Sequence, residues 1–193
     1  MRSFLLLFLI FVLPAAALSK EKPPIVHRIP LPPRPDFSAL DWLLGEWSGK
    51  TDEKSPKGEL SLTVSYDLDQ RYMVFREQIS LAATPNLPET KETWLGIMTS
   101  ERSGGYTLRL FSDTGFITRY RVTVEGGNIT LSPEGGEQPP PGWLFRRLYQ
   151  RADVNAIAET VQVAPPDKPF FEYYSARLTR KAAPQAPVPP PNK

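Results

Sequence analysis

Polar and apolar residues alternate along most of residues 36–181. In Leu60–Tyr66, for example, Leu60, Leu62 and Val64 are separated by serine and threonine. A period of two is typical of β-strands that bury one face. The ten prolines in this region fall between candidate strands, where a missing amide donor is tolerated. The pattern predicts an all-β domain over residues 36–181.

One short helical signal precedes the strands. Asp36 and Ser38 are both candidate caps for a turn that carries Leu40 and Leu43 and ends at Gly45. We therefore expect a single helical turn before the first strand.

Four turns set the register of four hairpins. The turns lie at Leu68-Asp69, Asp113-Thr114-Gly115, Gly126-Gly127 and Asp153. They pair Val64 with Met73, Leu62 with Phe75, Leu60 with Glu77, Leu108 with Tyr120, Val122 with Leu131, Tyr149 with Ile157 and Phe145 with Val161. Each register leaves a polar opposite face, on which we expect Arg109, Arg119 and Arg121 to be solvated.

Further strands around Trp47, Trp94 and Phe171–Leu178 bring the count to nine or ten antiparallel strands in meander order. We expect a single closed up-and-down barrel, because closure removes unpaired strand edges. A two-sheet sandwich is the alternative.

The first residues have the pattern of a secretory signal. Arg2 is followed by the apolar run Phe4–Leu13 and by small residues at Pro14–Ala17. The run is shorter than the roughly 20 residues that span a bilayer. The sequence predicts a signal peptide at 1–17 and an exported protein, periplasmic or extracellular, without a stable membrane anchor after cleavage. An uncleaved N-terminal anchor is the alternative.

Proline is concentrated on both sides of the β domain. Residues 18–35 form a Pro-rich linker and residues 182–193 a Pro-rich tail that we expect to be disordered. Either segment is alternatively a ligand for a partner that binds polyproline. The single histidine, His27, lies in the first segment, which argues against a catalytic role.

Composition excludes several classes of function. The chain has 193 residues, no cysteine, one histidine and a formal net charge of +2. Disulfides, Cys-ligated metals and thiol nucleophiles are excluded, no metal site is expected, and the balanced charge gives no footprint for nucleic acid. No phosphate-binding loop, dinucleotide fingerprint or nucleophile elbow is present.

Three charged residues occupy apolar faces. Arg147 lies between Phe145 and Tyr149, the Asp153 turn places Glu159 opposite it, and Glu77 shares a face with Met73, Phe75 and Ile79. A buried charge is unfavourable unless it is paired. Arg147 and Glu159 therefore form an interior ion pair, bind the acidic end of an apolar molecule, or sit hydrated at the barrel mouth.

The segment Leu43-Leu44-Gly45-Glu46-Trp47-Ser48-Gly49 resembles the G-x-W start of calycin barrels, the superfamily of the lipocalins. The likeness is greatest to the nitrobindin-like branch and to uncharacterised bacterial lipocalin-like proteins. Trp94-Leu95-Gly96 and the closing Arg177-Leu178-Thr179-Arg180-Lys181 fit the same pattern, which covers most of Phe37–Lys181.

The resemblance implies a structural lock at one barrel end, with Trp47 beneath an arginine from the last strand, either Arg177 or Arg180. The nitrobindin-like branch binds haem through a histidine on that strand. This strand has none, although Tyr173 or Tyr174 lies near the corresponding place. We therefore expect no haem and no other cofactor.

These observations favour a non-catalytic barrel that holds a small hydrophobic or amphipathic molecule. The expected ligand-binding residues are Phe75, Glu77, Trp94, Tyr120, Phe145, Arg147 and Glu159. One alternative is an enzyme that uses Glu77 and Glu159 on a lipid-like or cyclic substrate. Another is a filled structural module whose Pro-rich tails hold partners. The oligomeric state is not predicted.

Overall fold

The computed structural model describes residues 31–85, 88–101 and 104–181. The chain divides into two units, residues 1–32 and 33–193, and the second is described here by itself. The predicted signal peptide, most of the Pro-rich linker and the Pro-rich tail lie outside the described residues.

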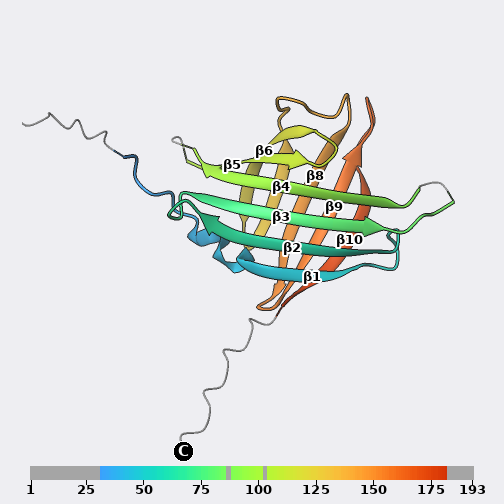
Figure 1. Cartoon of the computed structure of the whole chain (residues 1–193), viewed down its shortest axis with the longest axis horizontal. Helices are drawn as coiled ribbons and strands as arrows, with labels where there is room; N and C mark the ends of the chain where they lie inside the picture. Colours follow the sequence, from blue (N-terminus) through green and yellow to red (C-terminus); the bar gives the residue numbers. More distant parts are fainter. Residues whose placement is uncertain (1–30, 86–87, 102–103, 182–193) are drawn as a thin grey trace, which may run out of the picture. The chain divides into compact units, whose positions relative to one another are not determined.

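The second unit is a closed barrel of ten antiparallel strands (Figure 1). A 3-10 helix, η1 (Ser38–Leu43), precedes the strands. The strands are β1 (Gly45–Thr51), β2 (Gly58–Asp67), β3 (Tyr72–Leu81), β4 (Thr90–Ser100), β5 (Tyr106–Ser112), β6 (Ile117–Glu125), β7 (Asn128–Pro133), β8 (Leu144–Asp153), β9 (Ala156–Ala164) and β10 (Phe171–Arg180). Each strand pairs with its neighbours in sequence, and β1 pairs with β10. The all-β prediction is confirmed, with a barrel rather than a sandwich.

The expected helical turn is present at one end of the barrel. The Asp36 carboxylate accepts a hydrogen bond from the Ser38 amide at 2.9 Å, and Leu40 and Leu43 are completely buried. We call this end, with the β2–β3, β4–β5, β6–β7 and β8–β9 connections, the closed end. The opposite end, with the β1–β2, β3–β4, β5–β6, β7–β8 and β9–β10 connections, is the mouth. No helix in the described part of the chain is long and apolar enough to cross a membrane.

Two predicted registers are confirmed. Leu108 pairs with Tyr120 in the β5–β6 hairpin, and Val122 pairs with Leu131 in the β6–β7 hairpin. Glycine with positive φ occupies both turns, at Gly115 and at Gly126-Gly127. Such turns admit few loop lengths, and their register therefore follows from the sequence.

The β2–β3 register was predicted wrongly by two residues. Leu62 pairs with Glu77 rather than Phe75, and Val64 pairs with Phe75 rather than Met73. The turn is longer than two residues because Leu68, Asp69 and Gln70 all take positive φ. A shift of two keeps every side chain on its expected face.

The β8–β9 register was also wrong by two. Tyr149 pairs with Glu159, and Phe145 pairs with Val163. A bulge between Arg151 and Asp153 lengthens β8 before the turn. Arg147 consequently lies opposite Val161 and diagonal to Glu159.

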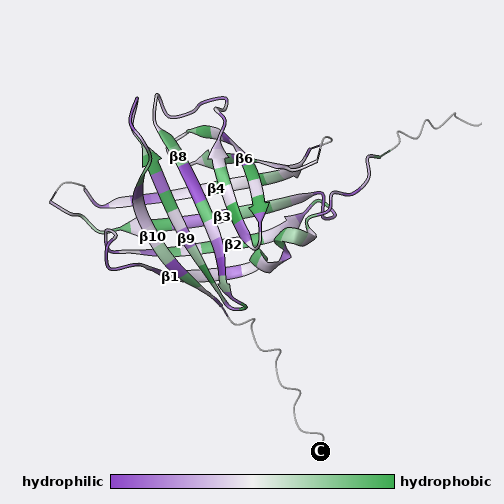
Figure 2. Cartoon of the chain, turned by 180° about the vertical axis from the view of Figure 1, so that it is seen from behind, coloured by the Kyte–Doolittle hydropathy of each residue, from purple (hydrophilic) through white to green (hydrophobic). Residues whose placement is uncertain are grey.

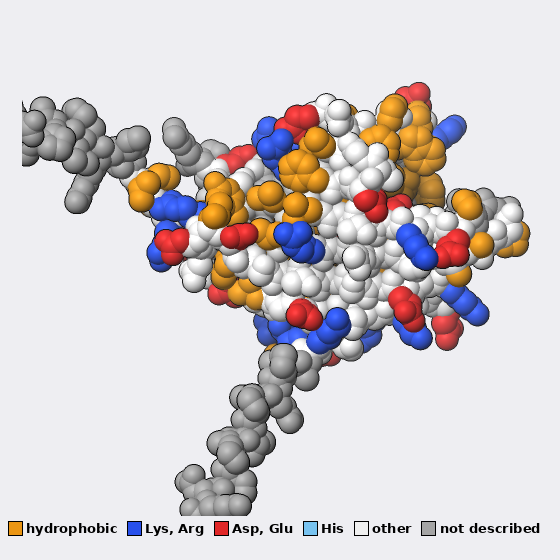
Figure 3. All heavy atoms as spheres, in the orientation of Figure 1, with side chains coloured by type: hydrophobic (Ala, Val, Ile, Leu, Met, Phe, Trp, Pro, Cys, Tyr) orange, Lys and Arg blue, Asp and Glu red, His pale blue; other side chains and the backbone are white. Residues whose placement is uncertain are grey.

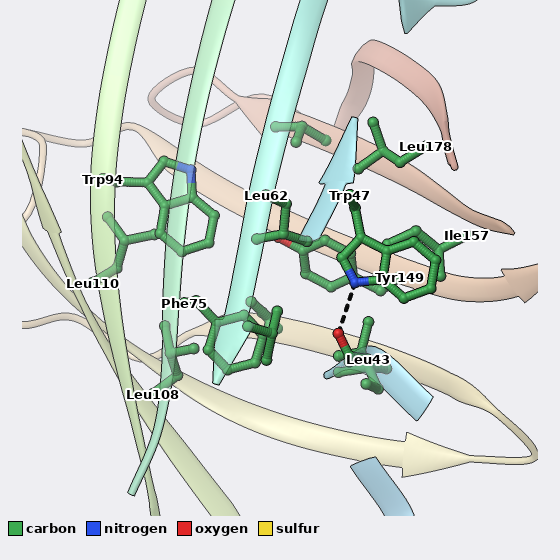
Figure 4. Close-up of a cluster of buried hydrophobic side chains, with 14 of the residues drawn as sticks. Leu43, Trp47, Leu62, Phe75, Trp94, Leu108, Leu110, Tyr149, Ile157 and Leu178 are labelled. Atoms are coloured by element: carbon green, nitrogen blue, oxygen red, sulfur yellow. Dashed lines mark hydrogen bonds between the residues drawn. The ribbon is translucent and has the colours of Figure 1, made fainter. Parts of the chain in front are cut away.

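Apolar side chains fill the barrel from the closed end. Colouring by hydropathy shows apolar and polar residues alternating along β8–β10 (Figure 2). Trp47, Phe75, Leu108, Tyr149 and Ile157 pack together inside, each no more than 1% exposed (Figure 4). Trp94 also points inward and is 2% exposed. As expected, Arg109, Arg119 and Arg121 lie outside in exposed ion pairs.

Candidate functional site

Three charged side chains meet inside the barrel. Nη1 of Arg147 on β8 lies 3.1 Å from Oε1 of Glu77 on β3 and 3.2 Å from Oε1 of Glu159 on β9. On each of these strands every second residue points inward, and most of the inward residues are apolar. Each of the three charged residues takes one of these inward positions. Of the alternatives left open for Arg147 and Glu159, the structure has the interior contact, and Glu77 joins it.

Three uncharged side chains donate further hydrogen bonds to Glu77. Its Oε1 accepts from Nε1 of Trp94 at 3.0 Å and from the Tyr174 hydroxyl at 3.4 Å, while its Oε2 accepts from the Tyr149 hydroxyl at 3.3 Å. The Arg147 guanidinium lies 4.7 Å from the centre of the Trp94 ring. We call Glu77, Trp94, Arg147, Tyr149, Glu159 and Tyr174 the polar cluster. Multiple donors favour the ionised form of a buried carboxylate.

The two glutamates differ in their partners. Oε1 of Glu159 accepts from Arg147 and, at 3.3 Å, from the Tyr174 hydroxyl, whose one proton it shares with Glu77, but its Oε2 has no hydrogen-bond partner in the described structure. Burial, followed by the proximity of Glu77, raises the pKa of Glu159 well above its ordinary value. The cluster thus combines one cation, Arg147, with two carboxyl groups, of which Glu159 has the raised pKa.

The remaining groups of the cluster keep their ordinary protonation. Burial raises the pKa of both Tyr149 and Tyr174, and the neighbouring glutamates raise it further. Burial opposes the charge of Arg147, but Tyr174 and Glu77 hold its pKa well above its ordinary value. Neutral tyrosines and a charged arginine result.

Of the three ionisable side chains, that of Arg147 is the most exposed. The side chains of Glu77 and Glu159 are both 0% exposed, whereas that of Arg147 is 7% exposed. Nε of Arg147 is buried and has no hydrogen-bond partner in the described part of the chain. A small polar group arriving from outside would therefore meet the Arg147 side chain before either carboxyl group.

Half-buried residues lie between the cluster and the mouth. Phe145 precedes Arg147 on the inward face of β8, and Glu92 precedes Trp94 on the inward face of β4. Burial raises the pKa of Glu92, Arg147 lowers it, and Asp113 and Glu77 raise it again. These interactions place Glu92 within electrostatic reach of the cluster.

A bulge in β10 adds an aromatic ring near the mouth. The pairing with β9 shifts between Glu172 and Tyr174, leaving Tyr173 as the extra residue. The ring of Tyr173 lies 5.8 Å from that of Tyr174, and its pKa is raised by burial and by Glu92. Bulges re-aim side chains in this way at barrel rims.

The seven residues predicted to bind ligand all face inward, but they are not equivalent. Four of them, Glu77, Trp94, Arg147 and Glu159, are in contact within the polar cluster. Tyr120 is buried beside Arg147. Burial raises the pKa of Tyr120, and Arg147 lowers it by a smaller amount. Phe75 packs in the filled core, and Phe145 lies toward the mouth.

Sequence reasoning missed Tyr149 as part of the site. It follows Arg147 by two residues on the inward face, and its hydroxyl could have been matched to the interior carboxylates. Tyr174 was considered only as a haem ligand. Its role in the cluster depends on the β9–β10 pairing, for which no turn-based register was available.

The lock at the closed end has one arginine. The Arg180 guanidinium lies 4.0 Å from the centre of the Trp47 ring, and Nε1 of Trp47 donates to the Leu43 carbonyl at 2.7 Å. Arg177 instead points outward and pairs with Asp153 at 3.0 Å. Of the two candidates, the structure places Arg180 over the tryptophan.

Two hollows lie over outward-facing residues of the described strands. One of about 530 Å³ lies over β2–β5, and Glu77 and Trp94 of the polar cluster are among its lining residues, with Arg76, Thr93 and Phe111. Another of about 560 Å³ lies between Lys57, Ser80 and Glu89. Among the described residues, no group of three or more His, Cys, Asp or Glu side chains could hold a metal ion.

Comparison with known proteins supports the fold. The crystal structure of Rv2717c from M. tuberculosis is similar, with a TM-score of 0.53 and 18% sequence identity over 75% of this chain and 96% of that one. At that identity the likeness shows the fold alone. No protein-family model matches the sequence. No curated protein matches it either.

Proposed function

We propose that this protein is a lipocalin-like barrel of the calycin type that binds a small hydrophobic or amphipathic molecule at its mouth, without catalysis. One observation carries the proposal: the side chain of Arg147 belongs to a buried polar cluster, and it is 7% exposed whereas those of Glu77 and Glu159 are 0% exposed. Binding sites typically combine an apolar wall with a few fixed polar groups.

Apolar residues at the mouth supply such a wall. Phe145 and Phe171 both pair with Val163, so all three share the inward face, and Phe171 is 51% exposed. Trp143 and Leu144 are 43% and 45% exposed beside them. Figure 3 shows apolar side chains gathered at the upper right, where the β7–β8 and β9–β10 connections lie in Figure 1. We call Trp143, Leu144, Phe145 and Phe171 the apolar lip.

The filled core restricts the ligand to the mouth side of the cluster. Trp47, Phe75 and Tyr149 occupy the space toward the closed end (Figure 4). The polar end of the ligand then meets Arg147 while its apolar body lies against the lip. Glu77 and Glu159 have no solvent contact, so no observation favours the catalytic alternative.

Export, the absence of a cofactor and the lack of a nucleic-acid partner remain part of the proposal. They rest on the N-terminal apolar run, on the absence of histidine from β10 and on the balanced charge.

The proposal is tested by native mass spectrometry of residues 18–193 incubated with decan-1-ol or with decanoate. A complex of one probe molecule per chain is expected. Phe145→Ala should weaken it at least several-fold because the lip loses apolar contact area. Arg146→Ala is the matched control, since Arg146 neighbours Arg147 but stacks on Phe170 at 4.0 Å.

A bare polypeptide mass with both probes would overturn the proposal and favour the filled structural module. Equal loss of the complex in Phe145→Ala and Arg146→Ala would indicate that the probe does not bind at the mouth.

A further inference from the structure

Resting on the proposed function, we infer that the polar end of the ligand is uncharged: a hydroxyl, ester, ketone or amide rather than a carboxylate or phosphate. The reason is the charge balance of the polar cluster around Arg147. This differs from the acidic ligand that the sequence suggested for Arg147.

Arg147 already has its counter-ion. Its Nη1 donates to Glu77 at 3.1 Å, and Glu77 also accepts hydrogen bonds from Trp94, Tyr149 and Tyr174. A carboxylate with this many donors keeps its charge. Arg147 and Glu77 together are neutral.

Counting Glu159 as well, the polar cluster has no excess of positive charge. Among the buried residues of the described barrel, two are acidic, Glu77 and Glu159, and one is basic, Arg147. Two ionised carboxylates would leave a net negative charge in a dry interior, where uncompensated charge is strongly disfavoured. A proton on Glu159 makes the cluster neutral, in agreement with the direction in which burial and Glu77 move its pKa.

The groups around the cluster add no cation. Tyr120 on β6, Tyr149 on β8 and Tyr174 on β10 present neutral hydroxyls, because burial raises the pKa of each. Glu92 on β4 and Tyr173 on β10 lie toward the mouth, and Glu92 interacts with Arg147, Asp113 and Glu77. A carboxylate placed against Arg147 would add a negative charge beside Glu77 and within electrostatic reach of Glu92.

A neutral hydrogen-bond acceptor is not repelled by the carboxyl groups around Arg147. It can accept a hydrogen bond from the guanidinium, whose Nε has no partner in the described structure, without changing the net charge, and a hydrogen bond to a charged group is worth about 1.5–3 kcal/mol. The cluster then offers a hydrogen-bond donor without net positive charge, so it does not favour an anionic ligand.

The test compares decan-1-ol with decanoate, two probes that share chain length and differ in charge. By titration calorimetry at pH 8, decan-1-ol should bind at least ten-fold more tightly. Decanoate should tighten by up to ten-fold for each pH unit from 8 to 6, because its binding takes up one proton. Equal or tighter binding of decanoate at pH 8 would overturn the inference while leaving the proposed function standing. No binding of either probe would instead overturn the proposed function.

Two variants test the charge balance directly. Glu77→Gln together with Glu159→Gln removes both carboxyl groups that can balance Arg147, so decanoate should become the tighter probe. Glu92→Gln changes a half-buried group and should tighten decanoate several-fold at pH 8. Arg146→Ala should change neither dissociation constant. Unaltered discrimination in Glu92→Gln and in a folded Glu77→Gln/Glu159→Gln would contradict the inference.

Discussion

The guanidinium of Arg180 covers the indole of Trp47, 4.0 Å from the ring centre, and donates to the main-chain carbonyls of Trp42 and Leu44. One side chain thus joins the last strand to the segment that leads from η1 into the first. Arg180→Lys keeps the charge but loses the planar pair of donors. We expect it to lower the free energy of unfolding by about 1–3 kcal/mol, measured by urea denaturation. Arg177→Ala, from the same strand but outside the barrel, should change it by less than about 1 kcal/mol.

Removal of the interior cation should be more damaging. Arg147→Met leaves the Glu77 carboxylate buried without its counter-ion, and breaking a buried pair in this way typically costs about 3–5 kcal/mol. The double variant Glu77→Gln/Arg147→Met should recover part of that loss, because no unpaired charge remains. Additive losses in the urea midpoints of the two single variants and the double variant would show that the charges are not coupled.

Glu159 should make stability depend on pH. Its pKa is raised in the folded barrel above the ordinary value of 4.5. Between these values the folded state holds a proton that the unfolded chain has released. The free energy of unfolding therefore falls as pH rises through that window, by at most about 1.4 kcal/mol per pH unit from this group. Glu159→Gln should flatten the slope between pH 5 and 8. A variant slope equal to that of the wild type would assign the dependence to other groups.

At Gly49 the main chain of β10 lies very close to β1. A Cβ there would lie 2.9 Å from Cα of Leu178, with main-chain atoms of Arg177 on the same side. Gly49→Ala must push β10 away from β1, and over-packing of this kind costs about 1–3 kcal/mol. Ser48→Ala, the adjacent position, is the control. Equal melting temperatures for the two variants would contradict the close approach.

The same contacts explain the G-x-W-x-G segment. A Cβ at Gly45 would lie 2.6 Å from Nη1 of Arg180, and Gly45 has φ of +124°. The first glycine therefore leaves room for the arginine, and the second leaves room for the strand that carries it. The motif is a packing requirement of barrel closure.

The faces of the strands followed from the sequence more reliably than the registers. Alternation placed Glu77, Arg147 and Glu159 inside, and an error of two residues in either hairpin does not alter that. The register errors arose where the backbone departs from regular turns, at Leu68–Gln70 and at the bulge before Asp153. Turn signals that depend on glycine were interpreted correctly.

The composition of the polar cluster was harder to foresee. Glu77 and Tyr174 are 97 residues apart, and their 3.4 Å contact depends on the curvature that brings β3 and β10 face to face across the interior. Alternation indicates which side chains point inward but not at what height along the barrel they meet. The position of Tyr173 was also not predictable, because no local sequence signal indicates the bulge that makes it the extra residue of β10.

The pairing of Trp47 with Arg180 means that the beginning and end of the barrel are adjacent in space. Every other hydrogen-bonded strand pairing joins neighbours in the sequence, so the hairpins can form by short loop closures, and the seam between β1 and β10 requires most of the chain to be in place. The order of strands around the ring has no intrinsic starting point. A circular permutant that begins at the Gly126-Gly127 turn would preserve all ten pairings, while the seam would become an ordinary hairpin.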